Sequence, residues 1–413
     1  MSRPVSRRVL MGATAAGALG VAVAGSVGLL VSRGPDPRPV GYGPLRPDPR
    51  GLLALPEGFR YRVVAEEGVS RLESGEPCPS DPDGAAAFAR PDGPGSVLVC
   101  NHEVSGDEPF PVPHVDGLVY DPAAGGGTTT IHVDADGGRQ RQFVSLAGTL
   151  NNCAGGRTPW DTWLSCEETE DVLDRPHGYV FEVDPHDQQA NRDPRPIKAL
   201  GRFPHEAVVV DAEEQQLYLS EDAFAPNGLL YRWTSPKEAP ALGKGVLRNL
   251  ADDAGVLQAM RAISDGRHVP DLSLATEIGT MYQVDWVTVP DRDATETSVR
   301  KQFTDDQVTR GRKLEGMWWG DGGVYVVSSF ARTDDGDSVT HDGQVWFLDP
   351  RAGTLTLRLR FAPAVDREAE PDGPDNITVS PFGGVMIAED GDGRPHLLGA
   401  TDRGALFLMA RSE

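Results

Sequence analysis

The stretch GYVFEVDP at residues 178–185 has two counterparts in the chain, GLVYDP at 117–122 and GQVWFLDP at 343–350. Each begins with glycine, continues with hydrophobic and aromatic residues, and ends at Asp-Pro. A second repeat joins a short hydrophobic segment to Glu-Asp, in YLSEDAF at 218–224 and MIAEDGDG at 386–393. Strand units that recur with similar endings are typical of blades around a central axis. The sequence therefore predicts an all-β fold, and a β-propeller in preference to a sandwich.

Short β-rich segments continue this pattern along the chain, separated by clusters of Gly, Asp and Pro. The segments predicted as strands are 59–65, 96–100, 117–121, 128–134, 141–146, 162–168, 178–184, 206–211, 216–222, 228–233, 322–329, 343–349, 354–360, 383–390 and 405–410. The pattern weakens between residues 239 and 299. There we expect an inserted, partly helical segment, with a helix near 255–261.

The composition favours a folded, acidic protein. The chain has 413 residues, of which 39% are hydrophobic, enough to build a buried core. Lys and Arg number 39 against 62 Asp and Glu, a formal net charge of −23. Without a basic run to follow a phosphate backbone, nucleic acid is excluded as a partner. An acidic surface also repels anionic substrates, so an anion-binding site here requires bound cations.

The N-terminus has the pattern of an export signal. Residues 1–32 contain SRRVL at 6–10, followed by a long Ala-, Gly- and Val-rich stretch, which is typical of a twin-arginine signal peptide. A retained membrane anchor is the alternative, but anchors favour Leu and Ile. Residues 33–54 are predicted as a linker and 55–413 as the propeller domain. We therefore expect the twin-arginine machinery to export a monomer that has no membrane contact afterwards.

Carboxylates stand at the ends of many predicted strands, beside His, Asn or another acid. These groups are Asn101-His102-Glu103, Glu167-Glu168, His205-Glu206, Glu221-Asp222, Glu315, Asp375-Asn376 and Glu389-Asp390. One such group alone is typical of a solvated turn. Because propeller strands converge at one mouth of the central channel, the whole set predicts an oxygen-rich site for hard cations such as Ca²⁺.

The four cysteines allow two interpretations. Cys78, Cys100, Cys153 and Cys166 could form two disulfides in an exported protein. Cys153, however, lies in a loop of small residues, where the backbone can approach a ligand closely. If Cys153 binds a transition metal through its thiolate, at most one disulfide can form. In the same stretch, Trp160 and Trp163 are expected to pack between blades.

The segment NNCAGGRTPWDTWLSCEE at 151–168 resembles the signature of the PhoX-type alkaline phosphatases, a family of exported bacterial enzymes. Asn151 to Gly156, Thr158 to Trp160, Thr162 to Leu164 and Cys166 to Glu168 all fit this signature. Further matches extend the resemblance over residues 55–410. They are Asn101-His102-Glu103, Phe203-Pro204-His205-Glu206, Leu314-Glu315-Gly316 and Pro371-Asp372-Gly373-Pro374-Asp375-Asn376.

The resemblance implies a six-bladed propeller that holds iron (Fe³⁺) and calcium (Ca²⁺) at its central mouth and hydrolyses phosphate monoesters. It implies that Cys153 is an iron ligand and that Asn101 faces the phosphate. Glu168, Glu206 and Glu315 match metal-binding carboxylates, and Glu206 is also expected in the catalytic set. The local pattern adds five weaker metal-ligand candidates: Glu221, Asp222, Asp375, Glu389 and Asp390.

The chain departs from the family where the resemblance implies an arginine that grips phosphate. Two residues before Glu315 this chain has Lys313, which keeps the charge but lacks the guanidinium fork. A shift of one residue in the alignment brings Arg312 to the same place. We expect Lys313 in the catalytic set of an extracytoplasmic phosphatase. The alternatives are a calcium-dependent, lactonase-like propeller hydrolase and a non-catalytic propeller that binds metal.

Overall fold

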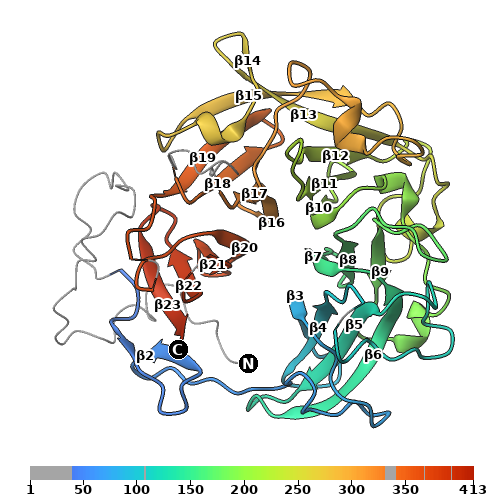
Figure 1. Ribbon diagram of the computed structural model, residues 1–413, viewed down its shortest axis with the longest axis vertical. Coiled ribbons are helices and arrows are strands. Elements are labelled where there is room, and N and C mark those ends of the chain that lie inside the picture. Colours follow the sequence, from blue (N-terminus) through green and yellow to red (C-terminus); the bar gives the residue numbers. More distant parts are fainter. Residues whose placement is uncertain (1–39, 107, 331–340, 367, 392) are drawn as a thin grey trace, which may run out of the picture.

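The computed structural model describes residues 40–106, 108–330, 341–366, 368–391 and 393–413. Antiparallel strand units surround a central axis (Figure 1), which confirms the predicted all-β propeller. The predicted signal peptide, residues 1–32, lies outside the described residues. Within the described part of the chain, no helix is long and apolar enough to cross a membrane.

Five strand units, which we call blades 1 to 5, follow one another around the axis within the described residues. Blade 1 contains β3 (Pro82–Ala89), β4 (Ser96–His102), β5 (Gly126–Val133) and β6 (Arg139–Thr149). Blade 2 contains β7 (Asn152–Arg157), β8 (Trp163–Glu167) and β9 (Val180–Val183). Blade 3 contains β10 (His205–Asp211), β11 (Gln216–Glu221), β12 (Leu230–Thr234), β13 (Val256–Ser264), β14 (Arg267–Val269) and β15 (Met281–Thr288). The predicted number of six blades stays a prediction.

Blades 4 and 5 follow blade 3 around the axis, and blades 3 and 4 form one continuous ten-stranded sheet because the last strand of blade 3 pairs with the last strand of blade 4. Blade 4 contains β16 (Leu314–Gly320), β17 (Gly323–Ser328), β18 (Gly343–Asp349) and β19 (Thr354–Phe361). Blade 5 contains β20 (Pro374–Val379), β21 (Val385–Glu389), β22 (His396–Ala400) and β23 (Leu406–Ser412). Short 3-10 helices lie between strands: η1 (Gln188–Asn191), η2 (Lys198–Leu200), η3 (Leu247–Asn249), η4 (Leu272–Leu274) and η5 (Val299–Gln302). The inner strands β3, β7, β10, β16 and β20 stand nearest the axis (Figure 1).

Part of the predicted linker belongs to the fold. β1 (Leu45–Arg46) pairs with β2 (Leu53–Pro56), and β2 pairs with the C-terminal strand β23. Figure 1 shows β2 beside β23 at the edge of blade 5. The predicted domain start at residue 55 is therefore too late, because backbone pairing, which composition does not reveal, adds residues 45–46 and 53–54 to the last sheet.

Three predicted elements are wrong. The helix expected at 255–261 is part of strand β13, whose Ala259 pairs with Tyr231 of β12 and Val287 of β15. Pairing on both sides overrides the helical propensity of this segment. Residues 59–65 form no strand and are mostly exposed. Residues 117–121 make one isolated bridge, from Val119 to Ala147.

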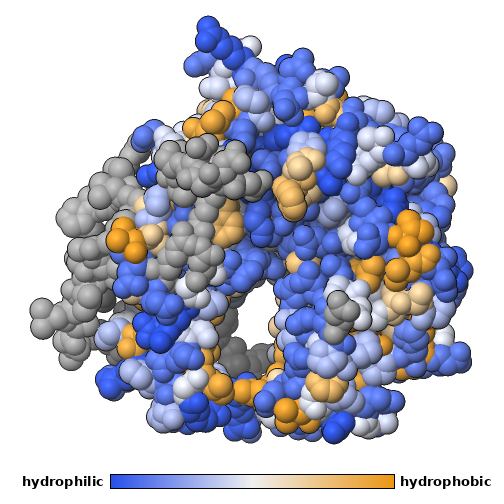
Figure 2. All heavy atoms as spheres, in the orientation of Figure 1, coloured by the Kyte–Doolittle hydropathy of each residue, from blue (hydrophilic) through white to orange (hydrophobic). Residues whose placement is uncertain are grey.

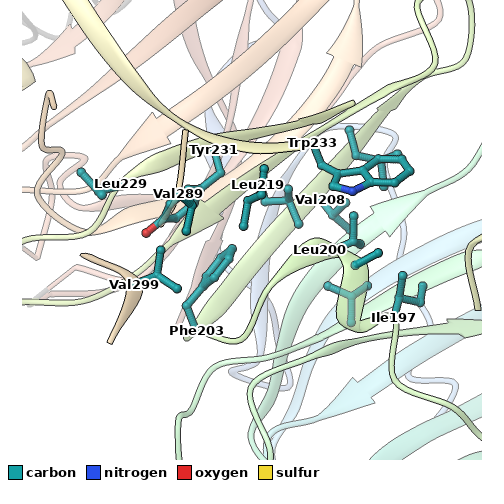
Figure 3. Close-up of a cluster of buried hydrophobic side chains, with 14 of the residues drawn as sticks. Ile197, Leu200, Phe203, Val208, Leu219, Leu229, Tyr231, Trp233, Val289 and Val299 are labelled. Carbon is teal, nitrogen blue, oxygen red and sulfur yellow. The ribbon is translucent and has the colours of Figure 1, made fainter. Parts of the chain in front are cut away.

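Hydrophobic side chains fill the spaces between consecutive blades. Figure 3 shows the cluster between blades 2 and 3, where Phe203, Val208, Tyr231 and Trp233 pack together. Trp163 is buried in the cluster between blades 1 and 2, as expected. In this view the outer surface is mainly hydrophilic, with an opening near its middle (Figure 2). Stacking of blades thus holds the inner strands in place around the axis.

Candidate metal centre

Each inner strand contains a β-bulge at the same point. In blades 1 to 5, the first residue of the inner strand pairs with the last residue of the second strand, and the register then shifts. Two residues of the inner strand therefore face one residue of its neighbour. The five bulges begin after Pro82, Asn152, His205, Leu314 and Pro374. A bulge changes the direction in which a side chain points, and the same bulge recurs in every blade described.

The second residue of every inner strand is an acid or a thiol. We call this set the inner ring: Asp83, Cys153, Glu206, Glu315 and Asp375. Their ligand atoms approach closely in overlapping groups. Within each group of three, all the ligand atoms lie within 4.8 Å of one another: Asp83 with Glu103 and Cys153, Cys153 with Glu168 and Glu206, and Glu206 with Glu315 and Asp375.

A second set of residues directly follows the second strand of each blade. We call it the outer ring: Glu103, Glu168, Asp222, Ser329 and Asp390. Four members are acids, and the groups above include two of them, Glu103 and Glu168. Burial, and then the charge of Asp222, raises the pKa of Glu168, while burial, and then the charges of Asp83 and Asp390, raise the pKa of Asp375, so Asp222 and Asp390 lie near the centre.

The electrostatics of the two rings favour bound cations. Burial, and then the charges of Glu315 and Glu168, hold the pKa of Glu206 well above its usual value. Burial and the neighbouring acids raise the pKa of Glu103 to about 8 and those of Glu168 and Asp375 to about 7. Burial, followed by the charge of Glu206, likewise raises the pKa of the Cys153 thiol. These acids repel one another unless protons or cations neutralise them.

The residues present fit a metal. Glu206 is 1% exposed, and its Oε2 has no hydrogen-bond partner among the described residues. A buried carboxylate oxygen without a donor is costly unless a cation binds it. The donor set combines several hard carboxylates with one soft thiol, Cys153, whose Sγ lies 3.1 Å from Asp83 Oδ2. Carboxylates suit calcium, and a thiolate suits a transition metal such as iron.

Lys313 is a cation that contacts the inner ring. Its Nζ lies 2.9 Å from Glu315 Oε1 and 3.7 Å from Asp222 Oδ2, and its side chain is 46% exposed. Burial lowers its pKa, but the charges of Glu315 and Asp222 outweigh this and raise it above the usual value. Its φ of 44° lies in the left-handed region, which is uncommon for lysine. Lys313 is therefore charged and partly open to an anion.

Arg312 does not replace Lys313. Its Nε lies 3.3 Å from Asp271 Oδ2, at the start of η4. The residue that the shifted alignment offers, Arg312, therefore contacts Asp271, which belongs to neither ring.

The structure corrects the role expected for Asn101. Its side chain is fully buried, and its Nδ2 donates to the carbonyls of Cys153 and Ala154. Its Oδ1 accepts from Trp163 Nε1 and Ser165 Oγ, so the whole capacity of the amide is used. Asn101 therefore does not face a phosphate. It holds the bulge that presents Cys153.

Asn101→Ala is expected to release metal. Truncation leaves two bulge carbonyls and two buried donors without partners, which costs about 1–3 kcal/mol of stability. It also frees the backbone that presents Cys153, so iron content measured by elemental analysis should fall. Asn191→Ala is a matched control, because Asn191 is also buried but bonds the backbone of Asp184, outside the rings. Full iron content in Asn101→Ala would contradict this role.

Glu221 and Glu389, expected as ligands, are not in either ring. Each is the last residue of a second strand, and side chains alternate along a strand, so the following acid is the one that faces the centre. Glu221 Oε2 accepts from Tyr231 Oη at 2.6 Å, and its Oε1 pairs with Arg300 at 3.1 Å. Glu389 Oε2 pairs with His396 Nδ1 at 2.8 Å. Both acids therefore bond neighbouring side chains outside the rings.

All four cysteines are free, so the disulfide interpretation is wrong. Cys78 and Cys166 are buried, and Cys100 lies on β4. Cys153 alone among them belongs to a ring.

Sequence reasoning missed Asp83 and left Glu103 out of the ligand set. A signal for Asp83 exists, because four of the five inner-ring residues are followed by Gly or Ala: Gly84, Ala154, Ala207 and Gly316. A Cβ at Gly84 would lie 2.6 Å from Ala154 Cα, so the bulges can pack together only if this residue is small. Asp-Gly at 83–84 has this pattern.

The inner strands also line a cavity of about 300 Å³. Its walls come from β7, β10 and β16, further along the strands than Cys153, Glu206 and Glu315, and include Trp318 and Trp319. These two tryptophans therefore line this cavity, away from the rings.

No curated protein matches the chain. Among solved structures, the Pseudomonas aeruginosa periplasmic gluconolactonase has 14% identity and a TM-score of 0.34, over 82% of this chain and 86% of that one. A Xanthomonas campestris gluconolactonase has 12% identity and a TM-score of 0.33, over 91% and 88%. A mutant of the Synechocystis apocarotenoid oxygenase has 15% identity and a TM-score of 0.30, over 89% and 68%.

A protein-family comparison gives the broader match. The model of the family described as alkaline phosphatase PhoX matches residues 40–142 and 134–413, which covers nearly all of the described chain. This range includes both rings and Lys313. The chain therefore belongs to the PhoX alkaline phosphatase family.

Proposed function

We propose that this protein is a metal-dependent phosphatase that hydrolyses phosphate monoesters outside the cytoplasm. Family membership supports a phosphatase in general. The observation that carries the specific proposal is the pair of rings, in which nine acids and thiols from five blades face one axis with Lys313 beside them. Eight of these side chains are carboxylates and one, Cys153, is a thiol; Ser329 is the one ring residue of the five described blades that has neither group.

Iron and calcium would bind at different parts of the rings. Cys153, with Glu168 and Glu206, offers the mixed thiolate and carboxylate set that suits iron. The carboxylates of Glu315, Asp375, Asp222 and Asp390 offer oxygen ligands that suit calcium. When bound, such cations neutralise the charge that develops on phosphoryl oxygens and activate water for attack.

The protein's own side chains would contact the phosphate and position the metal ligands. Lys313 supplies a positive contact for the phosphate at the partly open side of the ring. The bulges and Asn101 hold the ligand side chains in place before substrate arrives, which lowers the reorganisation that the reaction requires. Removal of the cations should therefore abolish both phosphate binding and turnover, because the empty rings repel an anion.

The test is turnover of a chromogenic phosphate monoester at alkaline pH, with and without a chelator, together with elemental analysis. We expect iron and calcium in the active protein and loss of at least about 10³-fold in rate with chelator, which corresponds to about 4 kcal/mol. Calcium without iron, together with hydrolysis of a lactone, would support the lactonase-like alternative. Metal without any turnover would support a binding propeller.

We propose in addition that the twin-arginine machinery exports the protein as a folded monomer. The motif at residues 6–10 supports this route, and a folded metal centre is compatible with it. Double substitution of Arg7 and Arg8 by Lys should leave the protein in the cytoplasm in a cell-fractionation assay. Unchanged export would remove the proposal.

A further inference from the structure

Two of the Gly-to-Asp-Pro repeats meet in a buried cluster outside both rings. Asp121 belongs to the repeat at 117–122, and His177 directly precedes the repeat at 178–185. His177 Nε2 lies 3.3 Å from Asp121 Oδ2, and its Nδ1 lies 2.7 Å from Glu167 Oε1. All three side chains are fully buried. We call them the Asp-His-Glu cluster, to which the proposed reaction assigns no role.

His177 carries a positive charge in this cluster. Each of its imidazole nitrogens faces a carboxylate oxygen, and only the protonated imidazole donates from both nitrogens. Burial lowers the pKa of His177, but the hydrogen bonds and charges of Glu167 and Asp121 outweigh this and raise the pKa above its usual value. A buried cation between two acids offsets the repulsion that would otherwise separate them. The histidine therefore fixes the position of the Glu167 carboxylate.

Glu167 connects the cluster to the rings. It is the last residue of β8 and directly precedes the outer-ring acid Glu168. Its Oε1 accepts from the backbone N–H of Leu150 at 3.0 Å, and its Oε2 accepts from two further N–H groups just before β9. One carboxylate thus bonds both the loop before β9 and the turn between β6 and β7, and that turn leads to Cys153.

The turn between β6 and β7 depends on this support. Leu150 is buried, and the Glu167 carboxylate accepts from its N–H. Asn151, which follows, has a φ of 47° in the left-handed region. Its carbonyl accepts from Glu168 N at 2.8 Å. Displacement of Glu167 would therefore loosen the turn and move Glu168 and Cys153, which belong to one close ligand group.

We propose that His177 is a positioning residue for the metal ligands Glu168 and Cys153. It acts by holding the Glu167 carboxylate in place, because both of its imidazole nitrogens bond acids outside the rings. The inference rests on the proposed function, since it assumes that iron binds the group of Cys153, Glu168 and Glu206. Iron affinity should therefore depend on a charge that lies outside the donor set.

His177→Gln tests the inference, because glutamine can donate one hydrogen bond to Glu167 but carries no charge. The iron dissociation constant of the metal-free protein is measured by titration with ferric iron in competition with a chelator, well below the Tm. We expect this constant to rise by about tenfold or more, as is typical when the support of a metal ligand is removed. Asp121→Asn keeps the bond from His177 to Glu167 and should give a smaller rise, about threefold.

His341→Gln is the matched control. His341 is also fully buried, but its Nε2 bonds the carbonyl of Ser273 at 3.1 Å and its Nδ1 accepts from Gly343 N, and both partners lie outside the rings. This variant should have a lower Tm and keep the iron affinity of the unmodified protein. A purely structural role of His177 would give the same result as this control.

Equal iron affinity in His177→Gln and His341→Gln would overturn the inference, and so would an unmodified protein that binds no iron. If His177→Gln does not fold, Asp121→Asn is compared with the control in the same way. The readout is metal affinity, so it is separate from the test of function. A protein whose iron affinity depends on His177 but which hydrolyses no monoester would contradict the proposed function alone.

Discussion

Glu206→Gln is expected to abolish phosphate release and, at the same time, to stabilise the metal-free protein. Glu206 is buried, belongs to two of the three close ligand groups, and has an oxygen without a hydrogen-bond partner. Gln removes the negative charge that a cation requires, so kcat/KM should fall by about 10³-fold or more. The metal-free protein loses an acid repelled by its neighbours, so its Tm should rise by a few degrees.

Opposite changes in activity and Tm separate this effect from misfolding. Glu221→Gln is the matched control, because Glu221 is a buried glutamate on the neighbouring strand β11 and pairs with Arg300. That variant should keep its metals and lose stability, since it breaks a buried pair. Activity is followed with a phosphate monoester and Tm by calorimetry in chelator. Retained activity in Glu206→Gln would refute the assignment of the metal centre.

The stability of the metal-free protein should fall as pH rises from about 4 to about 8. Burial and neighbouring acids raise the pKa of Glu103 to about 8, and those of Glu168 and Asp375 to about 7. In the unfolded chain these groups titrate near 4. Between these limits the folded state binds more protons than the unfolded state, so the free energy of unfolding decreases with rising pH.

Bound cations should reverse this dependence by replacing the protons. Ligands that bind only the folded state stabilise it, and deprotonated carboxylates bind cations more tightly. The gap in Tm between metal-loaded and chelated protein should therefore widen from pH 5 to pH 8, by about 5 °C or more. Thermal unfolding at several pH values, with and without chelator, measures it. If the Tm of the chelated protein rises over this pH range, the ring acids do not repel one another as described here.

Much of the site could be predicted from the sequence. The family resemblance implied Cys153, Glu168, Glu206 and Glu315 as ligands and the local pattern added Asp375, and all five lie in the close groups. The Glu-Asp and Glu-Glu pairs at strand ends were also recognised. The sequence could not show which member of a pair faces the axis, since that depends on strand register. Glu221 and Glu389 were therefore assigned to the metal, whereas they bond Tyr231, Arg300 and His396.

Register also explains the residues that were misjudged or missed. Asn101 lies two residues from Glu103 in sequence, but its side chain supports the bulge of the next blade. Asp83 meets Cys153 across seventy residues of chain, at 3.1 Å. Contacts of this range are set by the packing of one blade on another, so the Asp-Gly pattern at 83–84 does not by itself show that Asp83 contacts Cys153.

The amino-acid sequence by itself determined the strand repeats, the acid at each strand end and the thiol in its small-residue loop. These follow from hydrophobic alternation and side-chain chemistry, which are local properties. The tertiary structure alone decided that five bulges share one register, that they turn one acid or thiol per blade toward the axis, and that His177 lies between Asp121 and Glu167. The physical reason is that aim and distance depend on backbone pairing between strands and on the stacking of blades, both of which join residues far apart in the chain.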